Sequence, residues 1–488
     1  MGVSLNPASI LSGQGFDVNS VVQQILNEQS GPLSVWQNQE ATLQSQSIAL
    51  TAINNDLGHL ATAVQALSDP VGVFVSQTAT SSQPSILTAT AQTSAAAATH
   101  NIIVTSLATT GALYTAGIAD SNASILPGGN ATGDIQLQVG GATGTTHDIQ
   151  VTAGSNDTLN TLASYINTQS STNKWGVSAS VVTDATGSRL ALYSQSTGST
   201  GALSLSASAV PNNTTNLTFV APVGGANAAF TIDGVPFSST SNTVTGAIPG
   251  VTLNLLSASP GTPVQLTVGI DHSQITQAIN NFVSAYNTVI NDINTQYTVN
   301  PVTNTEGPAG GDPSLRTLQS SLLSDAASAL PLDSNGGFVN LESLGINTNN
   351  DGTLTVGLNA AGHSLNDIVA SNPAAVQNFF QNSSSTGFAQ TLSGDLSSLT
   401  DPTAGVLNVD LAQNKTSIKN LSDNIANFEV QLAAEQTQLT QRYSAVNASL
   451  QSYPLLLQAI TEVLGSMGGG SSSSSGAGSS NPTLTSGL

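Results

Sequence analysis

A seven-residue apolar repeat near the C-terminal end constrains the fold of this chain more than any other feature. Seven positions spaced seven residues apart are all apolar: Leu411, Ile418, Ile425, Leu432, Leu439, Val446 and Tyr453. Because a helix keeps residues at this spacing on one face, the repeat predicts a long helix whose apolar stripe packs on a partner helix. A neighbouring row starts with Leu421 and Phe428 but turns polar at Glu435. Pro454 is expected to kink or end the helix.

The N-terminal end carries a weaker repeat that can supply the partner. Asp17 suits the N-cap of a first helix that ends near Ser30-Gly31, and Phe16 could staple onto Val21. Pro32 fits the start of a second helix, which ends at Asp69-Pro70. One row of this helix is apolar at every seventh residue: Trp36, Leu43, Leu50, Leu57 and Val64. Its companion row is half polar, so the predicted seam is weak.

Apolar residues on these two stripes are the candidate interface residues. The N-terminal set comprises Phe16, Val21, Ile25, Trp36 and Leu43. The C-terminal set comprises Ile418, Ile425, Leu432, Leu439 and Val446. Spacing alone leaves open whether the stripes pack on each other within one chain or await partner subunits. Their placement at both ends favours a helical stalk that carries β domains at its far end, a shape that suits a subunit of a tubular polymer.

Between the helical ends, residues 74–270 change to strand patterns. Apolar and polar residues alternate in short runs bounded by Gly, Asn and Asp, as at Ile135, Leu137 and Val139. Residues 158–169 are expected to form one short helix inside this region, and residues 272–296 return to a helical pattern. The predicted fold class is therefore multidomain α+β. Terminal helices form a coiled-coil stalk and a helical domain, and nested antiparallel β domains are inserted in the middle.

Charge and composition exclude several functions. The 488 residues hold 6 Lys and Arg against 27 Asp and Glu, a formal net charge of −21. A nucleic-acid binder needs a clustered cationic face, and anionic membranes would repel such a chain. Cysteine is absent, which excludes disulfides and thiolate sites. No membrane span and no secretory signal pattern in residues 1–30 can be recognised, so we expect no membrane insertion.

Motifs for catalysis or cofactors are weak. Residues 347–352 resemble the opening of a calcium loop, but Leu358 stands where a bidentate Glu is required, so a hairpin turn at Asp351-Gly352 is the better prediction. The glycine-rich run at 140–144 lacks the Lys of a phosphate loop and is predicted to be a loop between strands. The five histidines have no metal-ligand spacing. We therefore expect no enzyme activity, no cofactor and no metal.

Several blocks of the sequence resemble the flagellar hook-associated protein 2 family, the filament caps. Residues 11–22 (LSGQGFDVNSVV) with Pro32-Leu33 are similar to the family's N-terminal motif. Further blocks follow in the family's order: 85–91 (SILTATA), 102–104 (IIV), 230–234 (FTIDG), 241–244 (SNTV), 248–253 (IPGVTL), 282–287 (FVSAYN), 311–312 (GD), 344–346 (LGI) and 351–354 (DGTL). Residues 113–218 match no such block and would be the variable, outermost domain.

The resemblance implies a non-enzymatic ring of about five subunits at the distal end of the bacterial flagellar filament. Such a cap promotes flagellin polymerisation and prevents leakage of exported flagellin. Its implied partners are other copies of itself, flagellin, hook–filament junction proteins and an export chaperone. The implied route is secretion by the flagellar type III apparatus, without a cleaved signal peptide.

Four domains are expected on this resemblance. Terminal coiled-coil segments with a disordered Gly/Ser tail comprise 1–42 and 426–488, and a helical leg domain comprises 43–73 and 271–425. A first β domain comprises 74–112 and 219–270, and an outer β domain comprises 113–218. Three alternatives remain open: a flagellin or hook–filament junction protein, a surface adhesin that binds glycans through its Ser, Thr and Asn residues, and a hydrolase with dispersed carboxylates.

Overall fold

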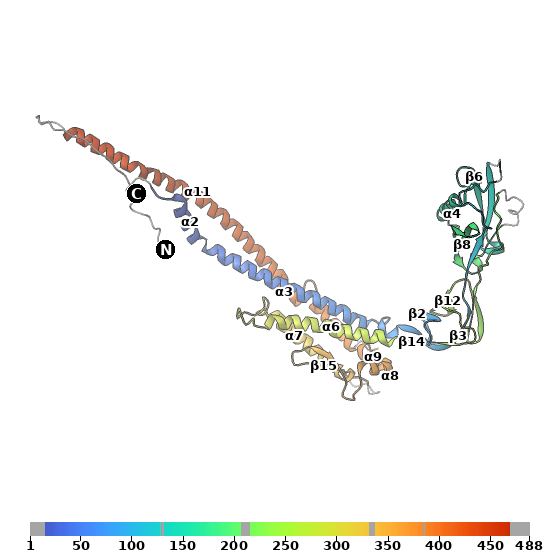
Figure 1. Ribbon diagram of the computed structural model, residues 1–488. Helices are drawn as coiled ribbons and strands as arrows, with labels where there is room; N and C mark the ends of the chain where they lie inside the picture. The colour runs from blue at the N-terminus through green and yellow to red at the C-terminus, as the bar shows by residue number, and fades with distance from the viewer. Residues whose placement is uncertain are drawn as a thin grey trace, which may run out of the picture.

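The protein is elongated, with paired helices at one end and β-sheets at the other (Figure 1). The computed structural model describes residues 15–468 except 127, 129, 130, 206–214, 331–336, 383 and 385. The α-helices are α2 (Val18–Gln29), α3 (Gly31–Ser68), α4 (Leu159–Asn173), α6 (His272–Tyr297), α7 (Pro313–Ala326), α8 (Leu365–Ser371), α9 (Pro373–Phe380), α10 (Phe388–Leu399) and α11 (Val406–Gly468). The predicted multidomain α+β class is confirmed.

The helix starts follow their capping residues. The Asp17 side chain accepts hydrogen bonds from the amides of Asn19 and Ser20, which confirms the predicted N-cap of α2. Pro32 lies in the first turn of α3, where its missing N–H costs nothing. Thr158 is the N-cap of α4 and Asp271 the N-cap of α6, so both helices begin close to where they were predicted.

Helix α11 does not end at Pro454, so that part of the prediction is wrong. It continues through the proline to Gly468. Proline removes one N–H and frees one carbonyl, and on the exposed end of a stalk water can hydrate that carbonyl. The predicted Gly/Ser tail lies outside the described residues, apart from its first residue Gly468.

A helical core unites α3, α6, α7, α8, α9, α10 and the start of α11. Leu57 of α3 and Phe282 of α6 are fully buried there, and Phe388 of α10 packs on Phe282 with ring centroids 5.8 Å apart. The hairpin β15 (Ile346–Thr348) and β16 (Leu354–Val356) joins this core. Its turn at Asp351-Gly352 is the predicted hairpin turn, and the Asp351 carboxylate accepts hydrogen bonds from the N–H and hydroxyl of Thr353.

An inner β core lies beyond the helical core. One antiparallel sheet has the order β1-β14-β3-β10-β11 and the other β12-β13-β2. Their strands are β1 (Gln77–Ser81), β2 (Leu87–Ala91), β3 (Ala98–Ser106), β10 (Ala228–Ile232), β11 (Val235–Ser239), β12 (Thr243–Ile248), β13 (Val251–Leu255) and β14 (Val264–Ile270). Asp233 and Gly234 form the two-residue turn between β10 and β11, with φ of 52° and 83°. Such positive φ values fit the twist of a tight hairpin.

An outer β core lies at the far end of the molecule (Figure 1). Two antiparallel three-stranded sheets, ordered β4-β8-β7 and β6-β5-β9, enclose it together with α4. Their strands are β4 (Thr110–Tyr114), β5 (Thr132–Val139), β6 (Thr145–Thr152), β7 (Val177–Asp184), β8 (Gly187–Thr197) and β9 (Leu203–Leu205). The glycine-rich run at 140–144 is the predicted loop, between β5 and β6.

Candidate assembly interface

The stalk is an antiparallel pairing of α11 with α3 and then with α2. Each step toward the N terminus along α3 and α2 corresponds to a step toward the C-terminal end of α11. Four contacts fix this register: Asn54 with Asn408 (Nδ2 to Oδ1, 3.2 Å), Trp36 with Phe428 (ring centroids, 5.5 Å), Gln29 with Glu435 (Nε2 to Oε1, 2.9 Å) and Phe16 with Asn447 (N to Oδ1, 2.9 Å). The two sequence stripes therefore meet within one chain.

The predicted N-terminal interface residues are covered to different degrees. Val21 is buried, whereas Phe16, Ile25, Trp36 and Leu43 are half-buried. The Phe16 ring lies edge-on to Tyr443 of α11, with centroids 6.1 Å apart. The proposed staple partner of Phe16 was Val21, but the ring contact that the structure gives Phe16 is with α11.

The predicted C-terminal interface residues divide along the helix. Ile418, Ile425, Leu432 and Leu439 are half-buried, consistent with a single stripe on a thin stalk. Val446, by contrast, is 45% exposed, and Tyr453 is 64% exposed. Nine of the ten predicted residues are thus at least partly covered by their own chain. A contact of the same residues with partner subunits stays a proposal.

Sequence reasoning missed the apolar end of α11. Six large side chains beyond Pro454 are exposed: Leu455, Leu456, Leu457, Ile460, Val463 and Leu464. The signal was present, because Ile460 continues the seven-residue repeat after Tyr453 and Leu456 and Val463 form a second apolar row. Expecting Pro454 to kink or end the helix obscured this signal. From residue 436 to 468 the only charged side chains are those of Arg442 and Glu462, so this end is nearly neutral.

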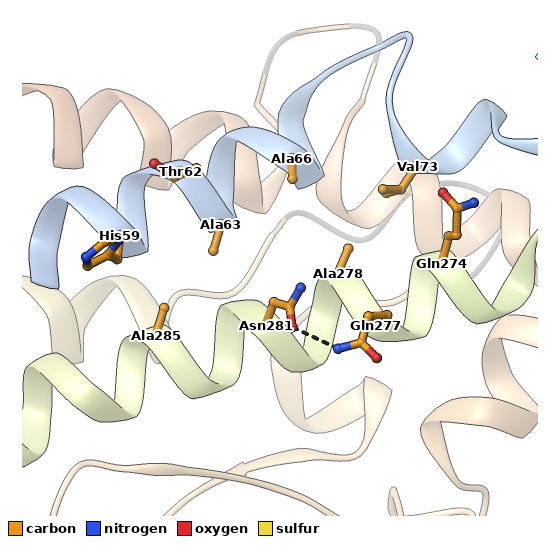
Figure 2. A pocket seen from close by; sticks show the side chains of 10 residues that line it. All are labelled: His59, Thr62, Ala63, Ala66, Val73, Gln274, Gln277, Ala278, Asn281 and Ala285. Atoms are coloured by element: carbon orange, nitrogen blue, oxygen red, sulfur yellow. Dashed lines mark hydrogen bonds between the residues drawn. The ribbon is translucent and has the colours of Figure 1, made fainter.

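A groove runs between α3 and α6, about 500 Å³ in volume (Figure 2). Its floor is made of small side chains, including Ala63 and Ala66 of α3 and Ala278 and Ala285 of α6. Amide side chains form the rim on α6, where Gln277 donates a hydrogen bond to Asn281 (2.9 Å; Figure 2). The only titratable side chain in its lining is His59. This groove offers shape and apolar area rather than acid–base chemistry.

Unusual electrostatics are found in the helical core, away from the stalk stripe. Burial, together with the neighbouring Asp395, raises the pKa of Asp325 to about 6. Burial also raises the pKa of Asp56, and a hydrogen bond with Asp292 adds to the effect. Each pair joins two helices: Asp325 of α7 with Asp395 of α10, and Asp56 of α3 with Asp292 of α6. Among the described residues, no group of three or more His, Asp or Glu side chains could hold a metal ion.

None of the described helices combines the length and the apolar character that crossing a bilayer requires. The molecule thus has three kinds of surface. They are a thin helical stalk with an apolar end, an alanine-lined groove between α3 and α6, and two β cores at the end opposite the stalk. This arrangement offers extended protein-contact surfaces and no candidate active site among the described residues.

Known families match most of the chain. The model described as flagellar hook-associated protein 2 N-terminus matches residues 14–111, and that described as flagellar hook-associated protein 2 C-terminus matches residues 225–453. A third model, flagellin hook IN motif, matches residues 134–196. This last match falls in the segment where the sequence blocks gave no resemblance.

Individual proteins agree with these models. The B-type flagellar hook-associated protein 2 of Pseudomonas aeruginosa is 32% identical over 469 residues, which cover 89% of this chain and 93% of that protein. The lateral flagellar hook-associated protein 2 of Vibrio parahaemolyticus is 27% identical over 56% of this chain and 62% of its own length. The crystal structure of the D1-D2-D3 domains of the flagellar cap protein FliD from Escherichia coli superposes with a TM-score of 0.54 at 27% identity, covering 75% of this chain and 99% of that one.

Proposed function

Because the chain belongs to the flagellar hook-associated protein 2 family, we propose that it is the structural cap at the distal end of a bacterial flagellar filament. The observation that carries the proposal is the extent of the likeness. It covers most of the chain at 32% identity to one relative, and 75% of the chain superposes on the Escherichia coli cap protein. In this proposal the protein is not an enzyme and works through its surfaces.

Several copies form a ring that holds exported flagellin while it folds and polymerises, and that prevents its leakage. The elongated shape supports this arrangement, since a subunit with its stalk at the filament end can hold its β cores beyond that end (Figure 1). A heterologous contact between identical subunits closes into a ring when its rotation allows. About five subunits remain our expectation for the ring.

The four domains that we propose keep the boundaries expected from the sequence. Residues 1–42 with 426–488 form the stalk end, and 43–73 with 271–425 form the leg. Residues 74–112 with 219–270 form the first β domain, and 113–218 form the outer one. Three separate hydrophobic cores support the division, because each lies within one of the last three units apart from a few side chains.

Partners and route follow from the same proposal. The stalk contacts other copies, flagellin and the hook–filament junction proteins, and an export chaperone holds the chain before secretion through the flagellar type III apparatus. A stalk with a single half-buried stripe supports this route, because thin helical pairs are marginally stable and unfold readily. The family models favour this reading over a flagellin or junction protein.

Deletion of the gene in the bacterium that encodes it tests the proposal. We expect cells to lose their filaments and to release unpolymerised flagellin into the medium, measured by electron microscopy and by immunoblotting of culture supernatants. Complementation with the intact gene should restore both. Normal filaments in the deletion strain would contradict the proposal, and loss of filaments without flagellin in the medium would point to an export defect instead.

A further inference from the structure

The groove between α3 and α6 leads to a pair of carboxyl groups. His59 of α3 and Ala285 of α6 lie at one end of the groove (Figure 2). Asp56 precedes His59 by three residues on α3, and Asp292 follows Ala285 by seven on α6. Helical residues at these spacings share a face, so both carboxyls lie on the groove side of their helices, about one to two turns beyond its end. The surface therefore has an alanine floor and an acidic end.

The two carboxyl groups at this end are paired with each other and not with a cation. Asp56 shares a hydrogen bond with Asp292, and both side chains are half-buried. Burial raises the pKa of Asp56, and the hydrogen bond and charge of Asp292 raise it further, whereas the nearby His59 lowers it. The ion pairs found among the described residues include neither carboxyl. A Lys or Arg brought to this end would relieve the repulsion between the two carboxylates.

An α-helix fits this groove better than an extended segment does. From Gln274 to Asp292, α6 rises about 27 Å along the groove, which equals about five turns of a second helix. The small side chains of the floor allow such a helix to approach closely, toward the lower end of the usual spacing of about 8 to 10 Å between packed helices. Both α3 and α6 bond their backbone groups internally, so an extended segment would find no strand edge to pair with, whereas a helix satisfies its own backbone.

We propose that the groove between α3 and α6 binds an amphipathic helix of another protein, with small apolar side chains over the alanines and a Lys or Arg beside Asp56 and Asp292. Charge complementarity selects this partner, because a chain of net charge −21 attracts basic segments and this end of the groove offers two carboxylates to one cation. A second copy of the chain is the alternative occupant, but it carries the same net charge and only 6 basic side chains. The proposal does not depend on whether the protein caps a filament.

Two synthetic helical peptides serve as probes. Each has about 20 residues, capped ends, alanine and leucine on one face and glutamine on the other. One peptide has a single lysine in its first turn and the other in its last turn, so that both directions along the groove are covered. In the matched control peptides glutamine replaces the lysine. Fluorescence anisotropy with the full-length protein measures the affinities. We expect one lysine peptide to bind with a Kd in the micromolar range, about tenfold more tightly than its glutamine match.

Two pairs of protein variants locate the binding. Ala66→Phe places a ring in the groove, whereas Ala41→Phe adds the same ring at an exposed position of α3 outside it. Asp292→Asn removes one carboxylate of the pair, whereas Asp423→Asn removes the same charge from an exposed position of α11. We expect Ala66→Phe and Asp292→Asn each to weaken binding of the lysine peptide about tenfold and both controls to leave it unchanged. If Ala66→Phe melts below the parent by circular dichroism, Thr62→Trp at the exposed rim takes its place.

Four results would overturn the proposal. They are a Kd above about 1 mM for both lysine peptides, equal affinities of the lysine and glutamine peptides, unchanged binding to the variants that fill the groove, and equal losses with Asp292→Asn and Asp423→Asn. Sedimentation velocity without peptide tests the alternative occupant. Self-association that falls with Ala66→Phe but not with Ala41→Phe would identify a second copy in the groove and would also contradict the proposal. None of these results bears on the gene-deletion test of the cap function.

Discussion

At the scale of single residues, Asp325 is under electrostatic strain, because its carboxyl is partly buried beside a second carboxylate. Its carboxyl lies on α7, faces Asp395 of α10 and Tyr286 of α6, and has one oxygen buried without a hydrogen-bond partner. Burial and the nearby carboxylate both favour the protonated acid, so its pKa rises from 3.8 to about 6. In the folded state the neutral form is therefore preferred up to weakly acidic pH.

The sign of the pH dependence follows from this rise. A carboxyl whose pKa is higher in the folded than in the unfolded state contributes most to stability below pH 3.8, and the contribution is lost as pH rises through about 6. The Asp325→Asn variant removes the charge and keeps the shape. We expect it to raise the melting temperature at pH 7.5 and to have little effect at pH 4. The gain should stay below about 3 kcal/mol, because solvent screens a partly exposed group.

Asp401→Asn, in the loop between α10 and α11, is the matched control. The Asp401 carboxylate accepts hydrogen bonds from Thr403 and Ala404, which hold its pKa below the usual value. The control should therefore show no stabilisation at pH 7.5. Thermal unfolding followed by circular dichroism measures the melting temperatures at both pH values. An Asp325→Asn protein that melts below the parent at pH 7.5 would show that the Asp325 charge does not destabilise the fold.

At the scale of helices and strands, periodicity predicted most of the fold. The repeat from Leu411 to Tyr453 became part of α11, and the alternation at Ile135 and Leu137 became β5 with both side chains buried. These signals are local, because a face of one element must be apolar to pack. The pairing of the two stripes was predictable to the same extent, since they meet along the stalk, whereas their contact with partner subunits stays a prediction.

What periodicity missed depends on contacts between distant segments or on solvent. Asp325 and Asp395 come together from helices 70 residues apart, which no local pattern records. The exposed end of α11 was missed because a proline rule written for helix interiors does not hold where water can hydrate the freed carbonyl. The groove between α3 and α6 arises from alanines that look like ordinary helix formers in the sequence.

Leu432→Asp tests the stripe of α11 as a working surface. Leu432 is half-buried on the side of α11 that pairs with the N-terminal helices, so a carboxylate there must be partly desolvated or push the helices apart, at a cost of a few kcal/mol if the stripe is covered. We expect filament growth to be lost in complemented deletion cells. The β cores should stay folded, as judged by hydrogen exchange of their strands.

The neighbouring Gln431→Asp variant provides the control for Leu432→Asp. Gln431 is exposed, so the same charge one position away should leave filament growth unchanged. Counting filaments by electron microscopy compares the two variants at equal protein levels. Normal growth with Leu432→Asp would mean that the stripe is no functional interface, whereas equal loss with both variants would mean that any added charge harms the stalk.

At the scale of the whole molecule, charge sets how copies of the chain meet. Each subunit carries 27 acidic and only 6 basic side chains, so a ring brings like charges together. The Debye length, beyond which charges are largely screened from each other, is about 10 Å at 0.1 M salt and about 30 Å at 0.01 M. We expect oligomers to strengthen as salt rises, because repulsion fades while apolar contacts persist. Sedimentation velocity at fixed protein concentration and neutral pH measures this, and oligomers that dissociate with added salt would point to ion pairs instead.

The most direct test of the central claim, that this protein caps the flagellar filament, is where it lies on the cell. Ser155→Cys puts a single reactive thiol on an exposed loop of the outer β core, in a chain that has no other cysteine. Cells that produce this variant can be labelled with a maleimide dye or gold particle and imaged together with their filaments. A filament cap predicts label confined to the distal tip of each filament. Label along the filament would indicate a flagellin, label at its base a junction protein, and label over the cell surface an adhesin, and each of these results would contradict the account.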